Sequence, residues 1–202
     1  MKPKQIKGVP EQQYGGSHDT ESEKRFEPVV LPSKFEILQN RFFSINQWQS
    51  YCGEGFADFR LYDHKGDLAE RNPQKGDFIR IDIPGPGEKE AEGYDWVEVT
   101  DICFCEERNS ESISMTCRPS EDPNNAKNDH IAHFYSSKAT STFMISRTTE
   151  NLTAAVYGRN ESPNLNAGMI DTVRNIFVAA GGMIGISKIQ WKRLTDGLLD
   201  FN

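Results

Sequence analysis

Apolar residues recur at helical spacing near the C-terminal end of the chain. A first run falls on one side of a helical wheel, and after Gly181-Gly182 a second run resumes the stripe with Lys188, Lys192 and Arg193 off it. The two runs are Ile170, Val173, Ile176, Phe177 and Ala180, and then Trp191, Leu194 and Leu198. The pattern predicts a helix over residues 166–180 and a second helix or a kinked continuation after it.

The middle of the chain alternates apolar and polar residues, which is typical of half-buried strands. About six strands are predicted, at residues 56–62, 78–83, 94–106, 112–118, 140–148 and 152–158. The alternation changes phase in the third, where Val97 and Val99 share one parity and Ile102 and Phe104 the other. A β-bulge near Asp101 would return all four side chains to one face and would turn the cysteines between them away from the core.

The segment before the strands is more polar. Residues 1–32 have no periodicity and predict a flexible N-terminal tail, in which the apolar residues 29–31 form a short extended edge. Residues 33–202 are then expected to form a single α+β domain. Ser44 and Gln47 have the spacing of a capping box, which predicts a short helix that ends at Gly53 and buries Trp48.

This order of elements is a short helix, a run of antiparallel strands joined by short links, and a C-terminal helical pair. No alternation of strand and helix is present, so a parallel doubly wound sheet is not expected. The arrangement resembles helix-grip folds in its architecture alone, and carries no function with it. The predicted class is α+β, a curved antiparallel sheet packed by C-terminal helices, and the alternative is a β-barrel with appended helices.

The charge is unevenly distributed. The net charge is −7, and residues 88–129 contain twelve acidic residues against four basic ones. An acidic middle repels phosphate backbones, so nucleic-acid binding is not expected. Neither a secretory signal nor an apolar run of membrane-spanning length is found, and four cysteines in a chain of 202 residues favour reduced thiols and a cytoplasmic location.

Several residues are candidates for metal binding or catalysis. Cys103, Cys105 and Cys117 with His130 and His133 could be drawn as a metal site, but the spacing lacks the usual two-residue knuckle, and we expect no metal, no cofactor and no disulfide. Asp129, His130 or His133 could supply a general base, but no serine or cysteine has the sequence context of an activated nucleophile. Catalytic activity is therefore the less favoured hypothesis.

Arg118, Arg147 and Arg159 lie at or near predicted strand ends. An arginine cluster suits a carboxylate or phosphate group, but pairing with the many local carboxylates is the favoured interpretation.

Two functional hypotheses follow. The first in preference is a non-catalytic interaction or assembly module, in which the tail and the acidic surface bind a protein partner. The alternative is a protein that holds a small apolar ligand in a cavity between the sheet and the C-terminal helix. The ligand-binding residues for that alternative are Trp48, Met115, Phe143 and Phe177, with Arg118 and Arg159.

Overall fold

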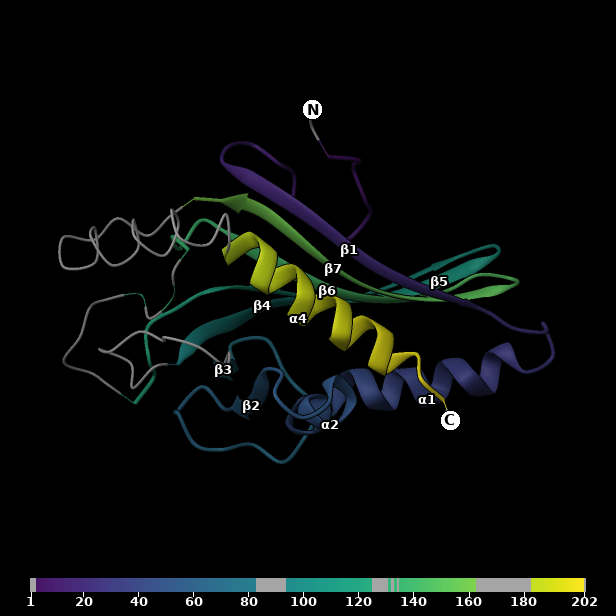
Figure 1. Cartoon of the computed structure of the whole chain (residues 1–202), viewed down its shortest axis with the longest axis horizontal. Helices are drawn as coiled ribbons and strands as arrows, with labels where there is room; N and C mark the ends of the chain where they lie inside the picture. Colours follow the sequence, from purple (N-terminus) through teal and green to yellow (C-terminus); the bar gives the residue numbers. More distant parts are fainter. Residues whose placement is uncertain are drawn as a thin grey trace.

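A single antiparallel sheet, strongly curved, forms the frame of the protein (Figure 1). The computed structural model describes residues 3–82, 94–124, 131, 133, 135–162 and 183–201. In this part of the chain seven strands pair in the order β1-β7-β6-β5-β4-β3-β2. Their bounds are Gly16–Arg25 (β1), Asp58–Tyr62 (β2), Phe78–Asp82 (β3), Asp95–Glu107 (β4), Ser110–Pro119 (β5), Thr140–Arg147 (β6) and Asn151–Glu161 (β7).

Alternation along the strands decides which side chains are buried. Ile79 and Ile81 of β3 and Met115 of β5 point to the same buried face. The predicted bulge in β4 is present, because the register with β5 shifts between Val99 and Asp101. The six strands read from the sequence are therefore confirmed, with end points that differ by a few residues.

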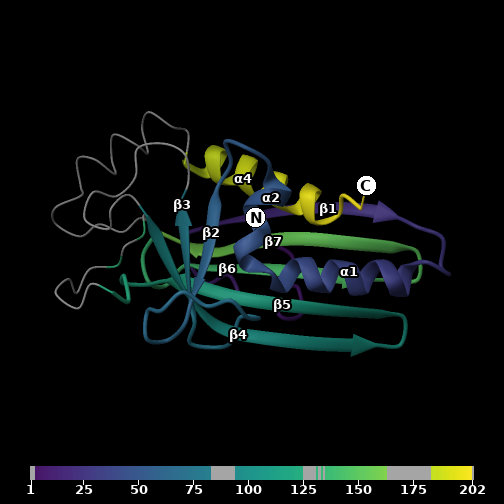
Figure 2. The same ribbon diagram turned by 90° about the horizontal axis from the view of Figure 1, so that it is seen from below.

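Helices cover one face of the sheet, which we call the inner face (Figure 2). They are α1 (Leu31–Phe43), the short 3-10 turn η1 (Ile45–Gln47), α2 (Trp48–Cys52) and α4 (Met183–Leu198). The α4 stripe is as predicted, with Trp191, Leu194 and Leu198 buried. The α+β class and the helix-grip-like architecture are confirmed. The barrel alternative is wrong, since the strand order ends on β1 and β2 and the sheet stays open.

The core between the sheet and the helices is aromatic. Trp48 of α2 lies with its ring centroid 5.2 Å from that of Phe59 and 5.0 Å from that of Phe143. Trp191 of α4 lies 5.6 Å from Phe143 by the same measure. The indole N–H of Trp48 donates to backbone carbonyls at the end of α1. Trp48 is thus the buried anchor expected of the short helix, and Gly53 ends α2 with a φ of 97°. The predicted capping box is not formed, because the Ser44 hydroxyl donates to the carbonyl of Asn40 at 2.7 Å.

The predicted flexible tail is wrong for residues 16–25, which form strand β1. This strand pairs with β7 along its length and adds the seventh strand to the sheet. Its buried residues are His18, Thr20 and Ser22, so its alternation is carried by polar side chains. A search for apolar periodicity therefore misses it, although the period of two is present.

Helix α1 was also missed, and residues 29–31 form no extended edge. Leu31, Phe35, Leu38 and Phe42 are buried at spacings of four, three and four residues, and Pro32 lies in the first turn. Ile37, which is exposed, interrupts this stripe in the sequence. Residues 3–15 lie on the opposite, outer face of the sheet, where Val9 packs in a small cluster with Met144, Ala155 and Tyr157.

Candidate functional site

Three of the residues predicted to line a ligand cavity belong to the core. Trp48, Met115 and Phe143 are buried and pack with the other members of the main apolar cluster. Phe177 and the rest of the predicted helix at residues 166–180 lie outside the described residues. The three described positions contribute to stability, and their binding role stays a prediction.

The three arginines pair with local carboxylates, as the favoured interpretation predicted. Arg118 contacts Glu98 at 2.7 Å and Arg147 contacts Glu111 at 2.6 Å. The Arg159 guanidinium contacts Asp19 at 2.5 Å, on the outer face of β7. Arg118 and Arg159 alternate with the buried apolar positions of their strands, so they do not point to the same side as Met115 and Phe143.

The cysteines and histidines drawn as a metal site are not brought together. Cys117 is buried in the core on the inner face, whereas Cys103 and Cys105 point away from it, as the bulge predicted. His130 lies outside the described residues. No group of three or more His, Cys, Asp or Glu side chains within the described ranges is arranged to hold a metal ion.

His133 is buried next to Tyr135. Its Nδ1 accepts the backbone N–H of Tyr135 at 3.0 Å, and the two rings stack. Burial lowers the pKa of His133 to about 3, so the ring is neutral near pH 7. This buried imidazole is bonded to the backbone and packs against Tyr135, so it contributes to the structure around it.

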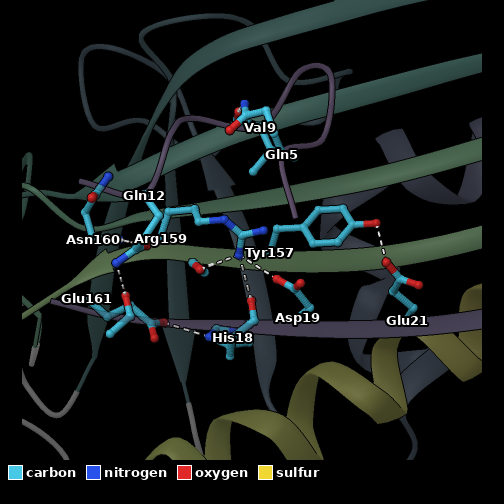
Figure 3. A network of polar contacts seen from close by, with 12 residues as sticks. Gln5, Val9, Gln12, His18, Asp19, Glu21, Tyr157, Arg159, Asn160 and Glu161 are labelled. Atoms are coloured by element: carbon cyan, nitrogen blue, oxygen red, sulfur yellow. Dashed lines mark hydrogen bonds and ion pairs between the residues drawn. The ribbon is translucent and has the colours of Figure 1, made fainter. Parts of the chain in front are cut away.

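A site that the sequence did not reveal lies where β1 and β7 meet. The Nδ1 atom of His18 is 2.7 Å from Oε1 of Glu161, and the two side chains are 3% and 4% exposed. Figure 3 shows the pair between the two strands, above α4. Nε2 of His18 is buried and has no hydrogen-bond partner among the described residues. We call this pair the His18–Glu161 site.

The backbone of β7 turns Glu161 toward His18. Asn160 has a φ of 56°, the positive region that asparagine tolerates better than most residues. The register between β1 and β7 shifts at this point, so Arg159 and Asn160 both point to the outer face and Glu161 turns to the inner one. The side chain of Asn160 fixes this turn, because its Oδ1 accepts the N–H of Gln13 at 2.8 Å.

Neighbouring groups hold the pair in place. Burial raises the pKa of Tyr135, and so do the negative charge of Glu161 and a hydrogen bond to it. A side chain at Gly158 would overlap both His18 Nδ1 and Glu161 Oε1, so glycine there makes room for the imidazole. The pair is therefore packed from the strand side and hydrogen-bonded through its carboxylate.

Helix α4 is held over the same strand by a polar contact. Ser22 of β1 lies 2.7 Å from the hydroxyl of Thr195 and donates to Asp196 at 2.7 Å. Lys192 bonds the same serine oxygen and also Asp196. Because His18 and Ser22 have the same parity on β1, the His18–Glu161 site faces the α4 side of the sheet.

The chemistry available to the site depends on Nε2 of His18, which has no partner in the part of the chain that the structure describes. An imidazole held by a carboxylate through Nδ1 presents Nε2 to whatever lies beyond it. Neutral, this nitrogen accepts a hydrogen bond from a hydroxyl or N–H group. Protonated, it donates to a carbonyl or carboxylate oxygen. A buried polar atom without a partner is costly, and such atoms mark places where a ligand group or a water completes the bonding.

Nothing local in the sequence predicts this pair. His18 and Glu161 are 143 residues apart, and only the pairing of β1 with β7 brings them together. A usable signal was the alternation of His18, Thr20 and Ser22 in a polar segment, which has the period of a strand.

Comparison with known proteins supports the fold alone. The sequence matches no known protein family, and no curated protein is significantly similar to it. The hypothetical protein jhp0584 from Helicobacter pylori aligns over 98% of this chain and 99% of its own, with a TM-score of 0.52 and 9% identity. XoxI from Bacillus cereus covers 92% of this chain and 97% of its own at a TM-score of 0.41 and 14% identity.

A third solved structure, Ara h 8.0201, aligns with 91% of this chain and 99% of its own at 12% identity. Its TM-score of 0.34 and that of XoxI are too low to support an argument. The first similarity concerns the arrangement of strands and helices and not activity. Within the described residues no helix is long and apolar enough to cross a membrane.

Proposed function

We propose that this protein binds a small ligand on the inner face of its sheet and that the His18–Glu161 site holds a polar group of that ligand. The observation that carries the proposal is the buried Nε2 of His18, which has no partner among the described residues. The proposal gives the earlier hypothesis of an apolar ligand a polar anchor. In this proposal the ligand lies beside the aromatic core and not within it, because the side chains of the core pack against one another.

The energetics favour a binding role over a purely structural one. Bringing a histidine and a glutamate to under 5% exposure costs desolvation energy. The hydrogen bonds of Glu161 to His18 and Tyr135 offset it only in part, because Nε2 of His18 has no partner among the described residues. A structural pair with both nitrogens bonded within the protein would have a smaller cost. A ligand hydroxyl, amide or carboxylate at Nε2 completes the set of hydrogen bonds and so adds binding energy of about 1–3 kcal/mol.

The variant His18→Asn tests this role with little disturbance. The asparagine amide takes the place of Nδ1 and still donates to Glu161, but no atom replaces Nε2. Native mass spectrometry of the wild-type protein, purified from its own host, is expected to show a retained small molecule. His18→Asn is expected to lose that molecule while keeping a melting temperature close to that of the wild type.

A thermal-shift screen of small carboxylic acids and alcohols gives a second readout. A ligand at a hundred times its dissociation constant stabilises by about 2.7 kcal/mol, which is easily detected. Equal retention by both proteins, or equal thermal shifts, would remove His18 from the binding site. If no small molecule is retained and no compound shifts the melting temperature of the wild type, the proposal is wrong.

The interaction module stays as the second candidate, supported by a groove along the edge strand. This hollow of about 610 Å³ lies between β1 and α4 and includes Lys188, Lys192 and the 58% exposed Ile189. An exposed edge strand next to an apolar side chain is a common docking place for a protein partner. A protein that co-purifies with the wild type and is lost from Ile189→Asp, but not from His18→Asn, would favour this function.

A further inference from the structure

The four cysteines fall into two classes. Cys52 and Cys117 are buried, and burial raises the pKa of Cys52 to about 12 and that of Cys117 further. Cys103 and Cys105 are half-buried on the outer face of β4, and their Sγ atoms lie 3.3 Å apart. The first two thiols are inert, whereas the second two form an accessible pair.

The strand holds this pair in a fixed geometry. Residues two apart on a strand point to the same face, and the bulge after Val99 turns that face outward. Cys103 and Cys105 lie opposite Ser114 and Ser112 of β5, so both are in the paired part of the β4–β5 hairpin. The backbone therefore places both cysteines on the same face of the strand, and their side-chain rotamers bring the two sulfurs to 3.3 Å.

Lys7 is close enough to the two thiols for a weak electrostatic interaction with them. The Lys7 ammonium is 2.9 Å from Glu107, and hydrogen bonding to that carboxylate, with smaller effects of Cys105 and Cys103, raises the pKa of Lys7. The Lys7 side chain is 65% exposed and is paired with Glu107, so its charge has only a small effect on the thiols. The hydrogen bond to Cys105 raises the pKa of Cys103, so the free pair rests as thiols and not as an activated nucleophile.

The spacing of the sulfurs favours a bridging atom over a direct bond. A disulfide needs sulfurs at about 2.05 Å and Cα atoms within about 6.8 Å, and residues two apart on a strand are already at that limit. An atom with bonds of about 2.3 Å to each sulfur spans the observed 3.3 Å at an angle of about 90°. That angle suits a pyramidal three-coordinate centre, and a tetrahedral ion would push the sulfurs apart.

We propose that Cys103 and Cys105 form a bidentate dithiol site for a thiophilic trivalent centre, of which trivalent arsenic is the model. Soft thiolates prefer such centres over the hard cations that carboxylates bind. With phenylarsine oxide two arsenic–sulfur bonds form and the arsenic–oxygen bond breaks. The two thiol protons leave with that oxygen as one water, and no oxidation state changes. This site is separate from the His18–Glu161 site and does not depend on it.

Intact-mass analysis of the reduced protein with phenylarsine oxide is the test. One adduct per chain is expected, which survives excess monothiol and is removed by a dithiol. Cys103→Ser and Cys105→Ser are each expected to bind on the order of 10²- to 10⁴-fold more weakly, the gain that two linked contacts provide. Cys52→Ala is the matched control and should bind as the wild type does. Circular dichroism confirms that each variant is folded.

Two results would overturn the proposal. Equal affinity of the wild type and the two serine variants would mean that a single thiol carries the adduct. Rapid formation of a disulfide between Cys103 and Cys105 under glutathione disulfide, with no retained arsenical, would mean that the strand permits the direct bond.

Discussion

Replacing Trp191 by alanine tests whether α4 is the apolar cover of the sheet. Trp191 is 6% exposed, and its ring centroid lies 5.6 Å from that of Phe143 and 6.2 Å from that of Phe59. Emptying a buried tryptophan site costs about 3–5 kcal/mol. Each aromatic contact contributes about 0.5–1.5 kcal/mol beyond the buried area, so the two account for a substantial part of that loss.

Ile189 on the same helix is the matched control, because it is 58% exposed. Ile189→Ala is expected to change the free energy of unfolding by less than about 0.5 kcal/mol. In urea, with a slope of about 2 kcal/mol per molar, Trp191→Ala lowers the midpoint by about 2 M, and Ile189→Ala by less than about 0.3 M. Near-equal midpoints would refute the reasoning and would mean that α4 lies loosely on the sheet.

Three further changes concern the His18–Glu161 site and its surroundings. Gly158→Ala puts a methyl group against His18 and Glu161, so a loss of about 1–3 kcal/mol is expected from urea unfolding, and an unchanged midpoint would contradict the packing. Burial lowers the pKa of His133 from 6.5 to about 3, so between these values the unfolded chain binds a proton that the folded chain does not. Stability therefore falls on acidification from pH 7 to pH 4, and His133→Asn should fall less steeply in urea titrations. Deleting residues 1–25 removes β1, and near-UV circular dichroism should show loss of fixed packing; a native spectrum would mean that β1 is dispensable.

The strands and α4 could be predicted because their apolar positions keep a clear period. Ile79 and Ile81 mark β3, and Trp191, Leu194 and Leu198 mark α4. The bulge in β4 could be predicted as well, since only an extra residue brings Ile102 into line with the core. In each case the buried set is apolar and local, so the pattern alone identifies it.

Strand β1 could not be predicted from hydrophobicity because its buried residues are polar. Its buried residues are His18, Thr20 and Ser22. Because these side chains are polar, the hydrophobicity pattern predicts a solvent-exposed tail for this segment. Polar side chains are tolerated there where partners across the fold bond them, as Thr195 bonds Ser22 and Glu161 bonds Nδ1 of His18. Such partners are 143 or more residues away in the chain, so no local pattern contains them.

The His18–Glu161 site depends on a local exception to strand geometry. With regular alternation, Glu161 would point to the outer face together with Arg159. The positive φ of Asn160 reverses the alternation by one residue and sends the carboxylate inward. A residue in that region costs about 1–3 kcal/mol unless the surroundings hold it, and here the N-terminal segment does so through the N–H of Gln13. Residues 3–15 therefore act on the site from the opposite face of the sheet, because they hold the turn that aims Glu161 at His18.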